Sequence, residues 1–90
     1  MIRRRATFYT RKGCHLCEQA WQAIARCRNR VGLDVEIVDV DANYQAGQLY
    51  GERVPVLAIE GGAVLEAFIS EESLTLALKN LNEKAAKSAS

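Results

Sequence analysis

The chain has 90 residues, of which 49% are hydrophobic and 26% are charged, and its formal net charge is +1. Ninety residues make one domain with a small core, and this composition excludes a disordered chain. Residues 1–33 carry eight basic side chains and one acidic one, but no recognition helix or stacking motif accompanies them, so we expect a solvated surface and no nucleic-acid partner.

Residues 5–9 are β-prone and predict a first strand, followed by a loop that Gly13 closes. From Leu16 onwards, apolar or small residues recur every three or four positions, which is the spacing of a helix with one buried face. Gly32 is expected to end this helix. The buried face comprises Leu16, Cys17, Ala20, Trp21, Ile24, Cys27 and Val31.

Residues 35–40 are rich in β-branched side chains and predict a strand that is covered on both faces and lies parallel to the first. Asp41 is expected to cap a short helix that runs through Tyr50 and ends at Gly51. Residues 54–59 then predict a third strand, with a proline near its start where a missing N–H is tolerated.

The remaining elements are a hairpin and a helix. Gly61-Gly62 predicts a two-residue loop between residues 56–59 and residues 64–68, which makes these strands antiparallel. Ser70 is expected to cap the last helix.

The predicted architecture is therefore α/β, with the order strand, helix, strand, helix, strand, strand, helix (βαβαββα). A right-handed crossover and a hairpin give a four-stranded mixed sheet flanked by three helices. We assign residues 1–83 to one domain and expect residues 84–90, which have nothing to pack against, to form a frayed tail.

Cys14 and Cys17 lie where the first loop meets the first helix. At the N-cap, free backbone N–H groups and the positive end of the helix favour the thiolate of Cys14 over the thiol. An offset of three places Cys17 one turn further in, within reach of a mixed disulfide on Cys14 but less exposed. Cys14 is therefore the predicted attacking residue and Cys17 the predicted resolving residue of a catalytic pair.

The same cysteine spacing also occurs in half of many zinc sites. A closed metal site needs two more ligands, and the sequence offers besides the pair only His15, which adjoins Cys14, and Cys27, which lies on the core face. We therefore expect no metal site and interpret Cys27 as a small buried hydrophobe. The alternative that stays open is a module of the same fold without turnover, which binds a metal or an iron–sulfur cluster through Cys14 or docks a partner.

Two segments resemble the glutaredoxin-like branch of the thioredoxin superfamily, namely Tyr9-Thr10-Arg11-Lys12-Gly13-Cys14-His15-Leu16-Cys17 and Arg53-Val54-Pro55-Val56-Leu57. The likeness in element order spans roughly residues 5–82 and implies the thioredoxin fold. It also implies that the Val54–Pro55 peptide bond is cis, that its turn lies against the dithiol, and that the Val54 backbone pairs with an incoming peptide or glutathione. Arg11 matches a basic position that meets a glutathione carboxylate in the family. With His15 beside Cys14, the predicted substrate-binding residues are Arg11, His15, Val54 and Pro55.

The chain departs from the family pattern in two places. His15 and Leu16 stand where glutaredoxins have proline and tyrosine, and a protonated His15 would favour the neighbouring thiolate although the helix end disfavours its charge. Residues 67–72 replace a glycine pair and an acidic residue that hold the γ-glutamyl end of glutathione. Arg11 therefore supports glutathione use, whereas this segment does not.

The residues and the resemblance together predict an enzyme, a thiol–disulfide oxidoreductase that exchanges the Cys14–Cys17 pair with protein or small-molecule disulfides. Glutathione is a candidate co-substrate, and no other cofactor is expected. The first ten residues lack the apolar run of a signal peptide, no stretch is apolar enough to cross a bilayer, and three cysteines do not fit a secreted disulfide framework. We therefore expect a cytoplasmic monomer without a membrane partner.

Overall fold

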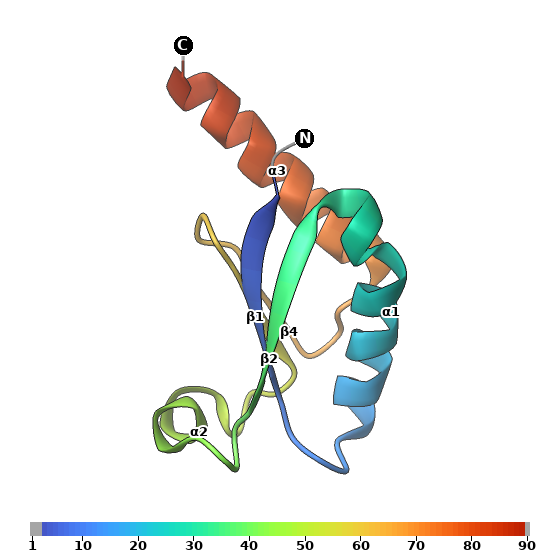
Figure 1. Cartoon of the computed structure of the whole chain (residues 1–90), viewed down its shortest axis with the longest axis vertical. Coiled ribbons are helices and arrows are strands. Elements are labelled where there is room, and N and C mark those ends of the chain that lie inside the picture. Colours follow the sequence, from blue (N-terminus) through green and yellow to red (C-terminus); the bar gives the residue numbers. More distant parts are fainter. Residues whose placement is uncertain (1–2, 90) are drawn as a thin grey trace.

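Seven elements follow one another in the order strand, helix, strand, helix, strand, strand, helix (Figure 1), which confirms the predicted order. The structure, a computed structural model, describes the backbone of residues 3–89 and the side chains of residues 3–84. The elements are β1 (Arg4–Thr10), α1 (His15–Val31), β2 (Leu33–Asp39), α2 (Tyr44–Tyr50), β3 (Val56–Ile59), β4 (Val64–Glu66) and α3 (Glu71–Ala89).

The four strands form one mixed sheet in the order β2-β1-β3-β4. β1 and β2 are parallel, with Arg4 paired to Leu33 at one end and Thr10 paired to Asp39 at the other. β3 is antiparallel to both β1 and β4. Since β1 and β2 run in the same direction, the loops that follow them emerge at the same end of the sheet, and the candidate site is built there.

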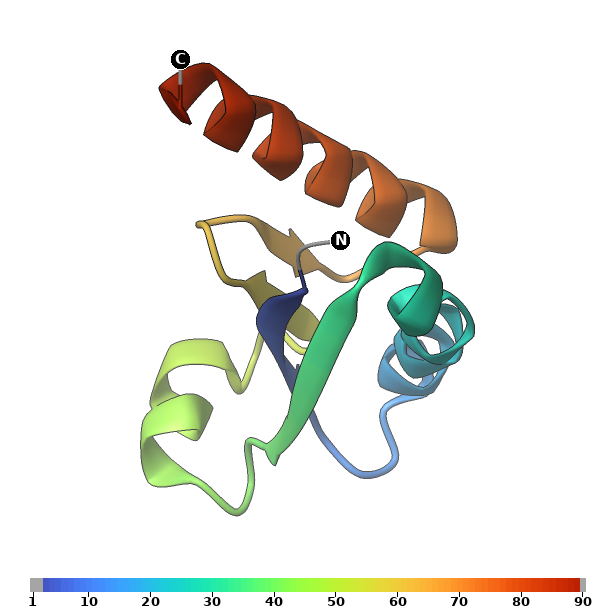
Figure 2. The ribbon, with the colours of Figure 1, turned by 45° about the horizontal axis from the view of Figure 1, so that its top comes forward.

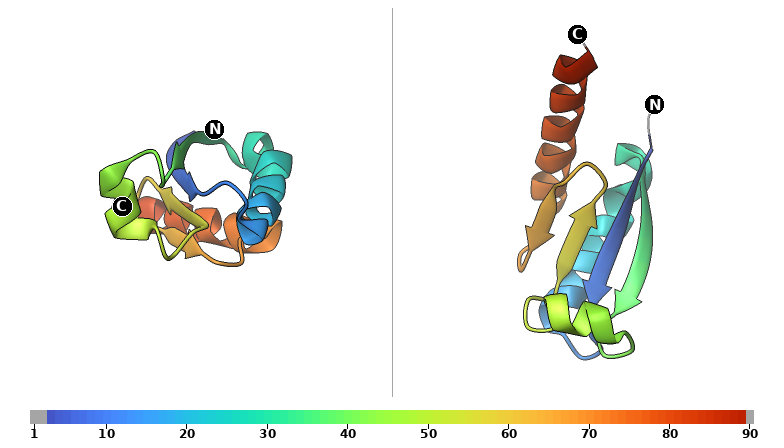
Figure 3. Two further views of the ribbon diagram at one scale, coloured as in Figure 1. Left: turned by 90° about the horizontal axis from the view of Figure 1, so that it is seen from below. Right: turned by 90° about the vertical axis from the view of Figure 1, so that its left-hand side faces the viewer.

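The helices cover the sheet unequally. α1 and α3 lie on one face, and α2 lies on the other side of the sheet, near the end where β1 and β2 finish (Figures 1 and 3). Phe8 of β1 and Leu57 of β3 are paired across the sheet and both belong to the buried layer between the sheet and these two helices. Full burial of one such side chain stabilises the fold by ~1.5–3 kcal/mol, so this layer fixes α1, and with it the start of α1, against the sheet.

The start and the end of α1 lie where the sequence predicts them. Cys14 is the N-cap, in an extended conformation, and Cys17 lies on the buried face of the helix together with Ile24. Gly32 follows the last residue with φ 74°, and its N–H donates to the carbonyl of Arg28. Glycine is the residue that adopts this left-handed conformation without a steric penalty.

α2 begins later than predicted. Asn43, and not Asp41, is its N-cap, and the Asn43 side-chain oxygen accepts a hydrogen bond from the N–H of Ala46 at 2.9 Å. The N–H of Asp41 instead donates to the side chain of Asp39 at 2.9 Å, which forms a local turn and keeps Asp41 outside the helix. In Figure 2, α2 stands on the opposite side of β1 from α1.

The strands of the hairpin are shorter than predicted, and their connection is longer. β3 begins at Val56, after the proline that lacks an N–H. The connection comprises the four residues 60–63, and the N–H of Ile59 donates to the carbonyl of Ala63 at 2.8 Å. β4 ends at Glu66 because Ala67 has φ 60°, a conformation with which a strand cannot continue.

Ser70 precedes α3 as its predicted cap. Its hydroxyl accepts the N–H of Ser73 at 3.0 Å, while the Ser73 hydroxyl accepts the N–H of Ser70 at 2.9 Å. α3 continues beyond residue 83 as far as Ala89; the fraying of residues 84–90 stays a prediction, and Ser90 lies outside the described residues. None of the helices within residues 3–89 is both long enough and apolar enough to cross a membrane.

Candidate active site

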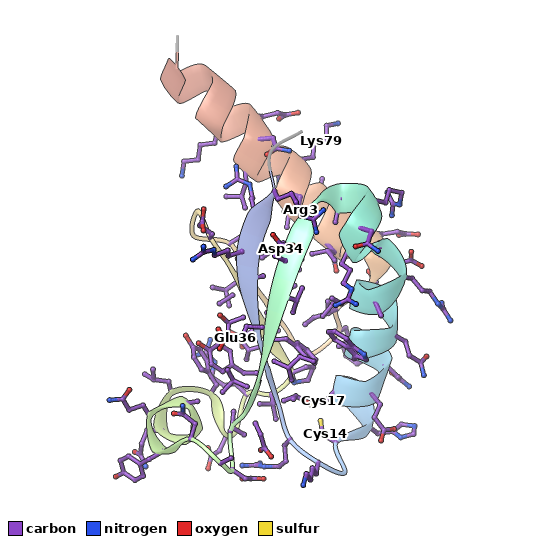
Figure 4. The ribbon with its side chains drawn as sticks, in the orientation of Figure 1. Arg3, Cys14, Cys17, Asp34, Glu36 and Lys79 are labelled. Atoms are coloured by element: carbon purple, nitrogen blue, oxygen red, sulfur yellow. The ribbon has the colours of Figure 1, made fainter. Side chains whose placement is uncertain are left out.

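Cys14 lies at the N-terminus of α1, at the end of the molecule opposite the two chain termini (Figures 1 and 4). The loop after β1 turns at Gly13, which has φ 77°, and the N–H of Cys14 donates to the carbonyl of Arg11 at 3.3 Å. The Cys14 sulfur accepts the N–H of Cys17 at 3.2 Å. This sulfur therefore takes the place of the hydroxyl or carboxylate that usually caps a helix.

Cys17 lies one turn further into the helix and is 2% exposed, whereas Cys14 is only half-buried. Both side chains lie on the side of α1 that faces the sheet (Figure 4). Burial and then the hydrogen bond shared with Cys14 raise the pKa of the Cys17 thiol. The pair is thus asymmetric: Cys14 is the accessible sulfur, and Cys17 is the buried sulfur whose pKa is raised.

Arg11 is held by two groups that are distant from it in the sequence, Asp41 and Gly51. Its Nε donates to both carboxylate oxygens of Asp41 at 3.1 and 3.0 Å, and its Nη1 donates to the carbonyl of Gly51 at 3.0 Å. The hydrogen bond and the charge of Asp41 raise the pKa of Arg11. The assignment of Asp41 as a helix cap is therefore wrong, because this carboxylate positions Arg11 beside the cysteine loop.

The contact between Arg11 and Asp41 could have been predicted from the parallel pairing of β1 with β2. The carboxyl ends of two parallel strands meet at one edge, and the N–H of Val40 donates to the carbonyl of Thr10 at 3.0 Å. An arginine directly after β1 and an aspartate shortly after β2 are therefore neighbours.

The Val54–Pro55 segment precedes β3 on the other side of β1. Its peptide bond is cis, Pro55 is buried, and Val54 is half-buried against the same core as Cys14. Tyr9 pairs with Val56, and continuing this antiparallel register places Val54 beside the loop that follows β1. Within residues 3–89 the backbone N–H and C=O of Val54 have no hydrogen-bond partner.

His15 has little contact with the protein. Its side chain is 86% exposed, and Nδ1 lies 3.8 Å from a carboxylate oxygen of Glu18, which is a loose pair on the surface of the first turn. The substrate-binding role of His15 stays a prediction.

A pocket of about 240 Å³ is lined by Cys17 together with residues of β1, the loop after β1, α1 and β2. Its apolar walls are Phe8, Trp21 and Ile37, and the rings of Phe8 and Trp21 are stacked with centroids 5.8 Å apart. Trp21 is the only tryptophan of the chain and therefore reports on the surroundings of Cys17.

All three cysteines are free thiols. Cys27 is fully buried, and burial raises the pKa of its thiol, as suits a small core residue. In the part of the chain that the structure describes, no three side chains of histidine, cysteine, aspartate or glutamate come together in a group that could hold a metal ion.

The sheet order, the arrangement of the three helices and a cysteine pair at the start of the first helix define the class of thioredoxin-like α/β proteins. Within this class the chain belongs to the glutaredoxin-like domain family (DUF836), whose family model matches residues 5–79. No curated protein matches the sequence.

Solved structures agree with this assignment. Protein XcR50 from X. campestris is 33% identical, with a TM-score of 0.71 over 83% of this chain and 96% of that one. Protein Ne2328 from Nitrosomonas europaea is 28% identical, with a TM-score of 0.66 over 82% of this chain and 89% of that one. Thioredoxin-2 of the malaria parasite, described as a component of its protein secretion machinery, has a TM-score of 0.73 over 87% of this chain and 82% of that one at 16% identity, which supports the fold alone.

Proposed function

We propose that the chain is a thiol–disulfide oxidoreductase that works through Cys14 and Cys17. The observation that carries this proposal is the sulfur of Cys14 at the N-terminus of α1, where it accepts the N–H of a buried second cysteine at 3.2 Å. A thiolate is the attacking species in disulfide exchange, and a helix N-terminus favours it.

The exchange needs two steps. The Cys14 thiolate attacks one sulfur of the substrate disulfide, so that a mixed disulfide forms and the other substrate sulfur leaves as a thiolate and takes up a proton. Cys17 then loses its proton and attacks the Cys14 sulfur, which forms the Cys14–Cys17 disulfide and releases the second substrate sulfur as a thiol. The substrate gains two electrons and two protons, which the cysteine pair has lost, and a thiol reductant such as glutathione restores the pair by the reverse exchange.

The backbone of Val54 is a candidate for substrate binding. Val54 lies two residues before β3, and its backbone groups have no hydrogen-bond partner within residues 3–89. An extended peptide could add there as a short strand, which is a recurring mode of peptide recognition. Arg11 and His15 flank the cysteine loop as further candidate contacts. We propose disulfide-containing proteins or glutathione mixed disulfides as partners of a monomeric, cytoplasmic enzyme.

Turnover of a small disulfide with glutathione as the reductant tests this proposal. We expect activity in the wild type and none in Cys14→Ser. When the pre-reduced proteins meet the disulfide without added glutathione, we expect Cys17→Ser to stop at the mixed disulfide, visible as an added mass on Cys14, because only a thiol can resolve it. Cys27→Ala is the matched control and is expected to keep turnover, since Cys27 lies in the core away from the exchange. Full activity in Cys14→Ser, or an inactive folded wild type, would overturn the proposal.

A further inference from the structure

β2 lies at the edge of the sheet, and one side of it has no neighbouring strand within residues 3–89. In the right-hand view of Figure 3, β2 forms the outer edge of the sheet next to β1. β2 and β3 lie on opposite sides of β1, so this edge is separate from the Val54–Pro55 segment. The pairing of β2 with β1 runs without a bulge from Leu33 to Asp39, and the strand contains neither lysine nor proline. β2 therefore lacks the features that commonly prevent a sheet edge from pairing with another chain.

The free edge presents the backbone of Val35 and Ile37. The N–H of Val40, directly after β2, donates to the carbonyl of Thr10 at the end of β1 at 3.0 Å. Backbone groups of successive residues point to alternate sides of a strand, so the even-numbered residues of β2 face β1 and the odd-numbered ones face away from it. Within residues 3–89 the N–H and C=O of Val35 and Ile37 have no hydrogen-bond partner. An extended chain can pair with these groups and add a strand to the sheet.

On the helix side of this edge, Ile37 leaves an apolar surface uncovered. Ile37 pairs with Phe8 of β1, so its side chain lies on the face that α1 covers, yet it is 54% exposed. It is one wall of the pocket of about 240 Å³ whose other apolar walls are Phe8 and Trp21. An added strand would place a side chain beside Ile37 and Trp21, and the burial of apolar surface favours an apolar residue there.

The opposite side of the same edge is acidic. Asp34 and Glu36 pair with Arg5 and Thr7 of β1, which places both acidic side chains on the face away from α1, along β2 (Figure 4). Asp34 forms an ion pair with Arg3 at 2.7 Å, whereas Glu36 is exposed and has no ion-pair partner within residues 3–89. Opposite charges on neighbouring strands attract and like charges repel, so this face favours basic side chains on an added strand.

A second copy of this chain matches the edge poorly. β2 carries three acidic residues, Asp34, Glu36 and Asp39, and no basic residue. Two β2 strands side by side would therefore bring acidic side chains of one copy against those of the other. The charges of β2 thus disfavour self-association through this edge and leave it open to a strand of opposite charge.

We infer that the free edge of β2 binds an extended segment of another protein in which basic and apolar residues alternate. Its backbone pairs with Val35 and Ile37, its apolar side chains cover Ile37 and Trp21, and its basic side chains lie beside Glu36. Alternate side chains of a strand point to opposite faces, which is why the alternating pattern fits. This docking surface goes beyond the proposed function, because it does not include Cys14 and its use involves no disulfide exchange.

Binding of peptides of seven residues, as long as β2, tests the inference. Lysine alternates with valine in the first peptide, and glutamate alternates with valine in the second. The third has the composition of the first, but its lysines are together at one end. None contains cysteine, so the result does not depend on the proposed exchange. We expect the first peptide to change the fluorescence of Trp21, to slow hydrogen exchange at the N–H groups of Val35 and Ile37, and to bind about fivefold more tightly than the other two.

Glu36→Lys should weaken the binding of the first peptide by about fivefold and strengthen that of the glutamate peptide. Glu52→Lys is the matched control, because it makes the same change of charge at an exposed residue in the turn after α2, and its effect should be clearly smaller. The inference would be overturned by an absence of binding, by equal affinity for the three peptides, by equal effects of the two variants, or by slowed exchange at Val54 in place of Val35 and Ile37. Slowed exchange at Val35 and Ile37 that increases with protein concentration, without peptide, would also overturn it, since a second copy would then cover the edge.

Discussion

Cys14 has two separable roles at the start of α1, and substituting it distinguishes them. Its sulfur caps the helix by accepting the N–H of Cys17 at 3.2 Å, and the same sulfur is the proposed nucleophile. Serine keeps a hydrogen-bond acceptor at this position but removes the thiol, while alanine removes both. We therefore predict that Cys14→Ser and Cys14→Ala are equally inactive in disulfide exchange but differ in stability.

The size of that difference follows from the cap. Loss of an N-cap acceptor typically lowers the free energy of unfolding by ~1 kcal/mol, within a range of about 0.5–2 kcal/mol. In a domain of this length ~1 kcal/mol lowers Tm by roughly 4–8 °C. α1 packs directly on the core through residues such as Ile24, so the lost cap is expected to affect global unfolding and not only the first turn.

Urea and thermal unfolding, followed by circular dichroism under reducing conditions, measure this effect. We expect Cys14→Ser to remain close to the wild type and Cys14→Ala to be less stable by about the amount given for a lost cap. Equal midpoints for wild type, Cys14→Ser and Cys14→Ala would refute the capping role of the sulfur.

Three further predictions follow from the site. Because burial raises the pKa of the Cys17 and Cys27 thiols, the folded state holds these protons more tightly than the unfolded chain. The contribution of these thiols to the free energy of unfolding of the reduced protein is therefore complete below pH ~8.5 and is lost as the pH rises through the folded pKa values. The slope is at most ~1.4 kcal/mol per pH unit for each thiol. A free energy of unfolding that does not change between about pH 8 and 10 would contradict this prediction. Asp41→Asn should lower the KM for glutathione disulfide severalfold, since it frees the Arg11 guanidinium for a carboxylate, and an unchanged KM would show that Arg11 makes no such contact. Finally, Trp21 shares a pocket with Cys17, so oxidation should change its fluorescence in the wild type but not in a Cys14→Ser variant, and identical spectra in both redox states of the wild type would argue against their proximity.

The sequence predicts the fold well where one local signal dominates. The helical spacing from Leu16 onwards and the left-handed Gly32 determine α1, and the cysteine at its N-cap is predicted from the loop-to-helix junction. The order of elements, together with the handedness of crossovers, predicts the parallel β1–β2 pair and the antiparallel β3–β4 hairpin, whereas the pairing of β3 with β1 is a finding of the structure.

The errors arise where two neighbouring groups compete for one role. Asp41 and Asn43 are both good helix caps, and the choice is made by Asp39, whose side chain takes the N–H of Asp41, and by Arg11, which takes the Asp41 carboxylate. The contact between Asp39 and Asp41 is local, whereas the contact between Arg11 and Asp41 depends on the tertiary pairing of β1 with β2, which helix-capping preferences do not contain.

The loop after β4 departs from the prediction for a different reason. Ala67 adopts φ 60°, a conformation that is uncommon for residues other than glycine. Its N–H donates a hydrogen bond to the carbonyl of Pro55, a contact that residue preferences do not contain.

The central claim is tested most directly by locating the oxidised thiols across a series of glutathione redox buffers, with free thiols trapped and the peptides analysed by mass spectrometry. We predict that a reversible disulfide joins Cys14 to Cys17, with the loss of two hydrogens, while Cys27 is trapped as a free thiol throughout. A pair that stays reduced in the most oxidising buffer, or a disulfide that includes Cys27, would contradict the account.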